Sequence, residues 1–210
     1  MLTQTPDSSA RRLEIIAAII LALASLLTAW SSYQAAQWSR TQGTKSNASV
    51  RVLVESAQYV TLAGQDSLVD VITFTNWLEA VSTDNQALED FYRSRFRAEF
   101  QPAFEAWLAL EPLTNPAAPN APFAMPEYDP ANRQAAADKQ AEAAVLQQES
   151  RAAAENAESY VRNTLFFASA LFFIGVSRMF SANRVRLALE ILAGILLLVG
   201  IYNALTVPIA

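Results

Sequence analysis

Three long apolar runs constrain most strongly what this chain can fold into. The first covers 13–30, and two more cover 163–180 and 187–207. A helix rises about 1.5 Å per residue, so the 18 residues of the first run reach about 27 Å. This length approaches the roughly 30 Å of a bilayer's hydrocarbon core. The sequence therefore predicts an all-α membrane protein with three transmembrane helices and a helical bundle between the first and second crossings.

The first run has a second interpretation, because Arg11 and Arg12 precede it as basic residues precede the apolar part of a secretory signal. Such an apolar part is usually about 7–15 residues long, which is shorter than this run, and the small residues Ala29 and Ser31 make a poor cleavage site. We therefore expect an uncleaved membrane helix over 13–30.

Short basic segments indicate how the chain crosses the membrane. Short loops rich in arginine stay in the cytoplasm, and the turn 181–186 carries two arginines just after Arg178. A cytoplasmic N-terminus at 1–12 agrees with this rule. Basic residues also follow the first run, but they belong to a connection of about 130 residues, where the rule is weak. We therefore expect 31–162 to be extracytoplasmic, with 208–210 as a short C-terminus.

The stretch TAWSSYQAAQWS at the end of the first run holds three aromatic residues, Trp30, Tyr33 and Trp38. Amphipathic rings are enriched where membrane helices leave the bilayer, so these residues are predicted to be interfacial anchors. The alternative is an aromatic cage for a cation. A cage would need carboxylates nearby, and the sequence has none between Glu14 and Glu55.

The composition excludes several kinds of chemistry. The chain has no cysteine and no histidine, which removes disulfides, thiolate or imidazole metal ligands, and any Ser-His-Asp or Cys-His arrangement. The segment 31–160 carries 9 basic and 17 acidic residues, a net charge of −8, which would repel a nucleic acid. We therefore expect neither an enzyme nor a nucleic-acid-binding protein, and no cofactor or metal.

Between the first two crossings, apolar residues recur every three or four positions, which is typical of helices. The first helix should loosen near Gly43 and break at Gly64, and a capping box from Thr83 to Gln86 should open a later helix. Aromatic residues at roughly helical spacing lie on both sides of Pro102, which should restart the helix. We expect these aromatic residues to form a core. They are Tyr92, Phe96, Phe100, Phe104 and Trp107.

Arg93, Arg95 and Arg97 form a basic cluster of the kind that binds anions. However, Glu89 lies four residues before Arg93, and Glu99 lies four residues after Arg95. Ion pairs along the surface of a helix therefore explain this cluster better than an anion site does.

Six of the nine prolines lie in the segment 111–130, EPLTNPAAPNAPFAMPEYDP. No helix or central strand tolerates this density of proline, so we expect a long loop. Loops of more than about 12–15 residues are often functional. Phe123, Met125 and Tyr128 are the candidate residues by which this loop either wraps the bundle or contacts a partner.

From 131 to 180 the chain has high helix propensity and no breaker, so one helix should run into the second crossing. Ala137, Ala141 and Ala144 share one face of this helix. Such a face permits close approach, either of the helix that leaves the first crossing or of another subunit.

Three segments resemble a group of uncharacterised bacterial inner-membrane proteins. They are AWSSYQAAQWSRTQ after the first run, PFAMPEY in the proline-rich loop and LFFASALFFIGVSRMFSANRVRLAL around the last turn. The resemblance touches both ends and the loop, so it covers most of the chain. It implies a bacterial inner-membrane location and three crossings. It assigns no activity and no functional residue.

Glu14 and Glu190 lie near the predicted cytoplasmic ends of their membrane helices. Carboxylates in such helices are often functional, so these two and the neighbouring Arg178 and Arg186 are candidates for an ion path. Arg186 lies four residues before Glu190, however, and a structural ion pair is the simpler interpretation. We therefore expect a structural or accessory membrane protein that acts through helix–helix contacts with a partner or a second copy. The alternative is a homo-oligomeric ion channel or transporter.

Overall fold

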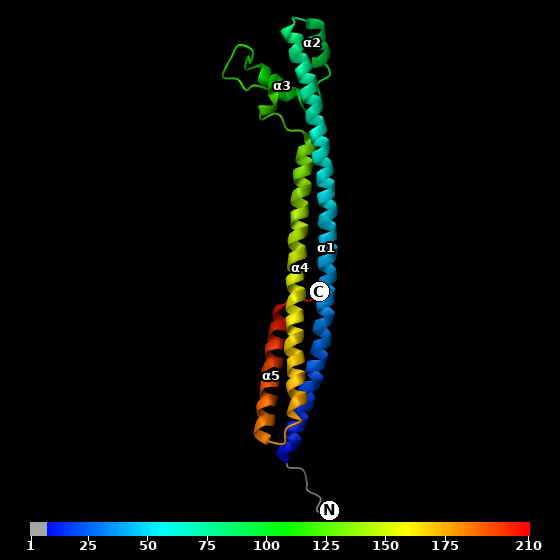
Figure 1. The fold of residues 1–210 in the computed structure, drawn as a ribbon, viewed down its shortest axis with the longest axis vertical. Coiled ribbons are helices and arrows are strands. Elements are labelled where there is room, and N and C mark those ends of the chain that lie inside the picture. Colours follow the sequence, from blue (N-terminus) through cyan, green and yellow to red (C-terminus); the bar gives the residue numbers. More distant parts are fainter. Residues whose placement is uncertain (1–7) are drawn as a thin grey trace, which may run out of the picture. The chain divides into compact units, whose positions relative to one another are not determined.

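The computed structural model describes residues 8–210, apart from the side chains at 8–10, 12 and 13. Within this part of the chain the regular structure is entirely helical (Figure 1). The helices are α1 (Ser8–Ser82), α2 (Gln86–Arg93), α3 (Gln101–Leu108), the short 3-10 helix η1 (Pro122–Ala124), α4 (Ala131–Ser177) and α5 (Asn183–Thr206). α1, α4 and α5 are long and apolar enough to cross a membrane. The predicted all-α fold with three such helices is confirmed, whereas most of the predicted N-terminal segment 1–12 lies outside the described residues.

The chain divides into two compact units. The first unit holds the residues up to 47 and those from 147 onward, and the second unit holds 48–146. α1 and α4 contribute to both units, α5 belongs to the first, and α2 and α3 belong to the second. Each unit has a hydrophobic core of its own.

Small side chains bring the three helices of the first unit together. Its core consists of Ala17 and Ala24 of α1, Phe167, Ala170 and Ile174 of α4, and Ala193 and Leu197 of α5. Gly200 of α5 faces the ring of Phe167, and a Cβ atom on this glycine would lie 2.5 Å from the ring's Cε1. Alanine and glycine let helices approach closely, which is how membrane helices gain contact area.

α1 and α4 run antiparallel in the first unit, as two contacts show. The Ser150 hydroxyl donates to the carbonyl oxygen of Gln42 at 3.1 Å. The Lys45 ammonium pairs with the Glu149 carboxylate at 2.7 Å. Both helices therefore contribute polar contacts beyond the apolar core.

Aromatic rings form the core of the second unit. The buried residues are Phe74 and Trp77 of α1, Phe96 and Phe100 before α3, Ala103, Phe104 and Trp107 of α3, and Tyr128 of the loop. Phe104 meets Trp77 and Phe96 edge to face, each at a centroid distance of 4.8 Å, which is a favourable geometry for rings. α3 has Pro102 in its first turn, where a missing N–H breaks no helical bond. The predicted aromatic core and the helix restart at Pro102 are confirmed.

Serine and alanine line the contact between α1 and α4 in the second unit. The hydroxyl of Ser49 donates to the carbonyl oxygen of Ala143, and that of Ser56 donates to the carbonyl oxygen of Ala136, each at 2.9 Å. The predicted alanine face at positions 137, 141 and 144 is exposed instead. α4 therefore approaches α1 through other alanines, Ala136 and Ala143. Of the two contacts predicted for the face at 137, 141 and 144, only the one with another subunit remains.

Two local predictions are wrong. α1 runs unbroken through Gly43 and Gly64, because an interior glycine costs a helix only about 1 kcal/mol relative to alanine and packing against α4 outweighs that cost. α2 is capped by Asn85, whose side chain accepts a hydrogen bond from the N–H of Leu88 at 3.2 Å. The capping box predicted from Thr83 is therefore not used.

Candidate functional site

A buried carboxylate, Asp70, lies at the centre of the polar contacts of the second unit. Its Oδ2 accepts hydrogen bonds from Arg97 Nη1 and from the Tyr128 hydroxyl, each at 3.1 Å. Arg97 also pairs with Asp66 at 3.2 Å and with Glu99. The Asp70 side chain is 1% exposed, and its Oδ1 has no hydrogen-bond partner among the described residues. Burial raises the pKa of Asp70, and the opposing effect of the Arg97 guanidinium is smaller.

This network fastens two irregular segments to α1. Arg97 lies in the turn between α2 and α3, and Tyr128 lies in the proline-rich loop. The guanidinium already has three carboxylate partners. Among the described residues, no group of three or more carboxylates is placed to hold a metal ion. The contacts of Asp70 with Arg97 and Tyr128 hold the turn and the proline-rich loop against α1.

The other two arginines of the basic cluster contact aromatic rings. The guanidinium carbon of Arg93 lies 5.7 Å from the centroid of Phe104, and that of Arg95 lies 4.3 Å from the centroid of Phe91. The ion pairs predicted for Arg93 and Arg95 with neighbouring glutamates are absent from the described residues. α2 ends at Arg93, so the helical spacing on which the Arg95 pair depended does not exist.

The three residues proposed as partner contacts of the loop pack against the aromatic core of the second unit. Tyr128 is buried, and Phe123 and Met125 are half-buried against the same core. The ring of Phe123 stacks on that of Phe100 at a centroid distance of 5.3 Å. The loop is therefore held within its own unit, and its contact with a partner stays a prediction.

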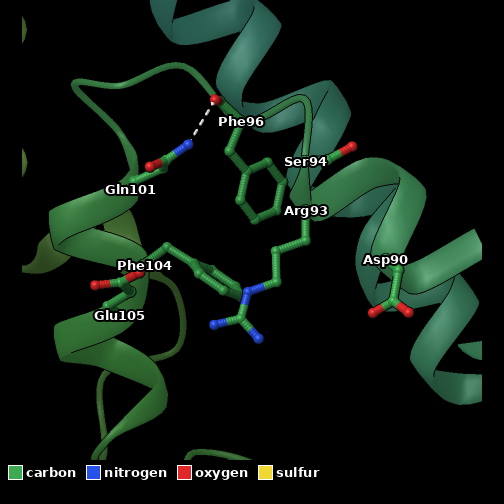
Figure 2. Close-up of a pocket in the computed structure, with 7 residues that line it drawn as sticks. All are labelled: Asp90, Arg93, Ser94, Phe96, Gln101, Phe104 and Glu105. Carbon is green, nitrogen blue, oxygen red and sulfur yellow. Dashed lines mark hydrogen bonds between the residues drawn. The ribbon is translucent and has the colours of Figure 1, made fainter.

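A groove of about 300 Å³ lies between α2 and α3 (Figure 2). Its lining residues are Asp90, Arg93, Ser94, Phe96, Gln101, Phe104 and Glu105. The Gln101 side chain donates to the carbonyl oxygen of Phe96 at 3.2 Å, and Arg93 lies over the Phe104 ring. Asp90 and Glu105 are exposed. None of these seven side chains has a buried polar atom without a partner, and the charged residues of the groove are exposed.

The two membrane carboxylates lie in different environments. Glu190 is 4% exposed, and its Oε1 accepts a hydrogen bond from Arg186 Nε at 3.0 Å. Its Oε2 has no partner among the described residues. Glu14 and Arg178 are exposed. The structure thus brings together Arg186 and Glu190, as their spacing predicts, and within the described residues it forms no ion pair between Glu190 and Arg178.

The three predicted interfacial aromatics differ in their surroundings. Trp30 and Tyr33 are 45% and 55% exposed, with ring centroids 6.2 Å apart. Trp38 is half-buried, and its Nε1 donates to the carbonyl oxygen of Pro208 at 3.0 Å. Exposed amphipathic rings fit an interfacial position, whereas Trp38 binds the C-terminal segment of its own unit.

An exposed apolar face of α1 was missed by sequence reasoning. In the second unit, α1 packs inward through Ser49, Ser56, Ala63, Asp70 and Trp77, each seven residues from the next. Among the other, exposed positions of α1 in this unit, eleven on one side of the helix carry no charge, whereas the charged exposed residues Arg51, Glu55 and Glu79 lie off that side. We name them the outer α1 face: Val50, Leu53, Val54, Ala57, Val60, Thr61, Gly64, Leu68, Val71, Thr75 and Leu78.

The outer α1 face differs from the exposed side of α4 in the same unit, which carries Arg133, Asp138 and Glu142. Nine of its positions follow one another in alternating steps of four and three residues from Val50 to Leu78. This is the spacing of a coiled-coil seam. The sequence of α1 therefore contains two helical repeats, one of residues that pack inward and a second one that forms the outer α1 face.

Comparisons of the chain with protein-family models, curated proteins and solved structures found no match. A functional interpretation therefore has to come from the geometry. Contacts within a single chain account for the other features described, but they do not account for the apolar composition of the exposed outer α1 face.

Proposed function

We propose that this protein has a structural or accessory role in a membrane, and that the outer α1 face docks a helix of a partner chain. The observation that carries this proposal is the complete lack of charge at eleven exposed positions of one helix. A solvated helix carries polar and charged residues on its outer side, and contiguous exposed apolar patches mark contacts with other proteins or membranes. The partner is a helix with an apolar, uncharged seam of the same spacing.

The proposal includes a location and a topology. The protein would lie in a bacterial inner membrane with its N-terminus in the cytoplasm and 31–162 outside it. Two observations support this arrangement. α1, α4 and α5 are long and apolar enough to cross a membrane, and Arg178, Arg184 and Arg186 gather at the connection between α4 and α5 and in the first turn of α5.

A channel or transporter is less well supported. The space between the helices of the first unit is filled by an apolar core that includes Phe167, Ile174 and Leu197. An ion would have to cross this core to pass through one chain, so a channel would have to form between copies. Glu190 pairs with Arg186, which favours a structural role for that carboxylate.

Single cysteines test the docking proposal, because the chain has none of its own. Leu68→Cys places a thiol on the outer α1 face. Gln65→Cys is the matched control, because Gln65 is exposed on the same helix but lies outside the face. In native membranes, a docked helix should slow maleimide labelling of Leu68→Cys several-fold relative to Gln65→Cys, and denaturation should abolish the difference. Equal labelling rates in native membranes would refute the proposal.

The topology has a test with the same chemistry. A maleimide that does not cross membranes should label Gln65→Cys in intact cells. It should label Arg184→Cys, in the first turn of α5, only after the inner membrane is permeabilised, because the connection between α4 and α5 is proposed to be cytoplasmic. The opposite pattern would invert the topology.

A further inference from the structure

We propose that the helix docked on the outer α1 face is the same segment of a second copy of this chain, so that two copies pair in parallel along 50–78. This inference rests on the proposed function and names its partner. Four features of the described residues carry it: charge, spacing, shape and area.

The distribution of charge favours a partner identical to the chain itself. In a symmetric pair, residues near the axis face their own copies, so a charged residue there would meet a like charge. The stretch from Val50 to Leu78 avoids this conflict, because none of its charged residues lies on the outer α1 face. Those residues are Arg51, Glu55, Asp66 and Asp70.

The spacing fits a parallel, in-register pair. The alternating steps from Val50 to Leu78 cover 29 residues, which meets the length of about three to four heptads expected of a coiled coil. In a parallel pair, residues such as Thr61 and Leu68 lie opposite their own copies. Chains that insert into one membrane through the same three helices share one orientation, so a parallel pair is the arrangement available to them. Confinement to the membrane also raises their effective concentration.

The shape of the face leaves room for close approach. Gly64 lies at its middle, and no atom lies within 4 Å of the position that a Cβ atom would take. Ala57, one heptad earlier, is also small. A groove of about 210 Å³ borders the face, and its lining includes Val60 and Gly64 of α1 and Ala136 of α4. Ala137 and Ala144 of α4 are exposed as well, and their small side chains protrude little from that helix.

The area is sufficient for a specific contact. Seven large aliphatic side chains of the outer α1 face are 37–60% exposed. With the small residues between them they offer on the order of 500 Å² per copy, or roughly 1,000 Å² in a pair. A specific interface needs about 1,000 Å² in total. A pair therefore reaches the area of a specific interface only when the two faces cover each other along most of their length.

Disulfide formation in native membranes tests the inference with the full-length chain. Thr61→Cys and Leu68→Cys lie on the outer α1 face, and Gln58→Cys and Gln65→Cys are matched controls three residues away on the same helix. Mild oxidation should give disulfide-linked dimers of the two face variants in several-fold higher yield than of the controls, because a disulfide needs Cα atoms roughly 4–7 Å apart. Equal dimer yields at all four positions would overturn the inference.

Labelling and oxidation together separate this inference from the proposed function. If Leu68→Cys is protected from maleimide but forms no dimer, the docked helix belongs to another protein, and only the inference fails. If Leu68→Cys is labelled as fast as Gln65→Cys and forms no dimer, both fail.

A charge on the face supplies a second measurement. Leu68→Glu places like charges opposite each other in a symmetric pair and should reduce the particle in mild detergent from two copies to one. Gln65→Glu adds the same charge outside the face and should leave two copies. Retention of two copies by Leu68→Glu would place the interface elsewhere and overturn the inference.

Discussion

The close contact between Gly200 and Phe167 gives a quantitative test of packing in the first unit. An alanine at position 200 would place its Cβ 2.5 Å from Cε1 and 3.0 Å from Cδ1 of the Phe167 ring, whereas carbon atoms in contact lie about 3.5–4.0 Å apart. The ring would have to move by roughly 1 Å. It is fully buried among residues of α1, α4 and α5, so this movement is resisted.

The magnitude follows from two opposing effects. Overpacking a tight core costs about 1–3 kcal/mol, and replacing an interior helical glycine by alanine returns about 1 kcal/mol. Gly200→Ala should therefore lose about 0–2 kcal/mol. Gly194 lies in the same helix with nothing within 4 Å of its Cβ position, so Gly194→Ala should be neutral or stabilising by up to about 1 kcal/mol.

Thermal unfolding in mild detergent would measure the difference between the two variants. Each kilocalorie per mole corresponds to about 2–4 °C for a chain of this size, so Gly200→Ala should melt several degrees below Gly194→Ala. Adding Phe167→Leu to Gly200→Ala should cost less than the two single changes together, because the smaller side chain relieves the clash. A melting temperature of Gly200→Ala at or above that of Gly194→Ala, or a double variant without coupling, would refute the predicted clash between position 200 and the Phe167 ring.

Two further predictions concern the second unit. Phe104→Ala removes a ring that is 1% exposed at the centre of the aromatic core and should cost about 3–5 kcal/mol in denaturant unfolding, whereas the exposed Phe91→Ala should cost far less. Burial raises the pKa of Asp70 above its unfolded value, so the folded chain keeps a proton that the unfolded chain releases, and its stability falls as pH rises through the folded pKa. Asp70→Asn removes this dependence, so the melting temperature of the natural chain relative to Asp70→Asn should fall as the pH rises from the ordinary aspartate pKa through the raised pKa of the folded chain; a constant difference would contradict the assignment.

The long helices could be predicted because their signals are local. Three apolar runs, at 13–30, 163–180 and 187–207, are longer than the apolar stretches of helices in soluble proteins. α4 follows the proline-rich segment and contains no proline up to its end at Ser177. The aromatic core was predictable for the same reason, since its rings recur at helical spacing. Each of these signals depends on residues within a few turns of one another.

Contacts between distant segments could not be predicted in this way. The Tyr128 hydroxyl reaches Asp70 from 58 residues away, and no local pattern pairs a loop tyrosine with one carboxylate among many. The choice of contact face on α4 was equally hidden. Alanine occupies positions 135, 136 and 137 in succession, so a small side chain is available on several faces, and periodicity cannot say which one meets α1.

The outer α1 face shows a different limit of sequence reasoning. α1 carries two sets of positions that repeat every seven residues, one through Ser49 and Ser56 and one through Val50 and Ala57. Hydrophobicity alone would bury the second set, which holds the larger aliphatic side chains. The first set is buried instead, because serine and alanine allow α1 and α4 to approach closely enough for hydroxyl-to-carbonyl hydrogen bonds at 2.9 Å.

The free energy available from burying the exposed side chains of the outer α1 face indicates whether this face stays in water or pairs. Burying a large aliphatic side chain stabilises by about 1.5–3 kcal/mol. Seven such side chains are 37–60% exposed, so about 5–10 kcal/mol per chain is available to a contact that covers them. This is comparable with the entire stability of a typical domain, about 5–15 kcal/mol. Association in solution costs about 4–15 kcal/mol, but two chains held in one membrane have already lost part of their translational and orientational freedom. Because a symmetric pair gains from both faces while the association cost is incurred once, the balance favours pairing over a face left in water.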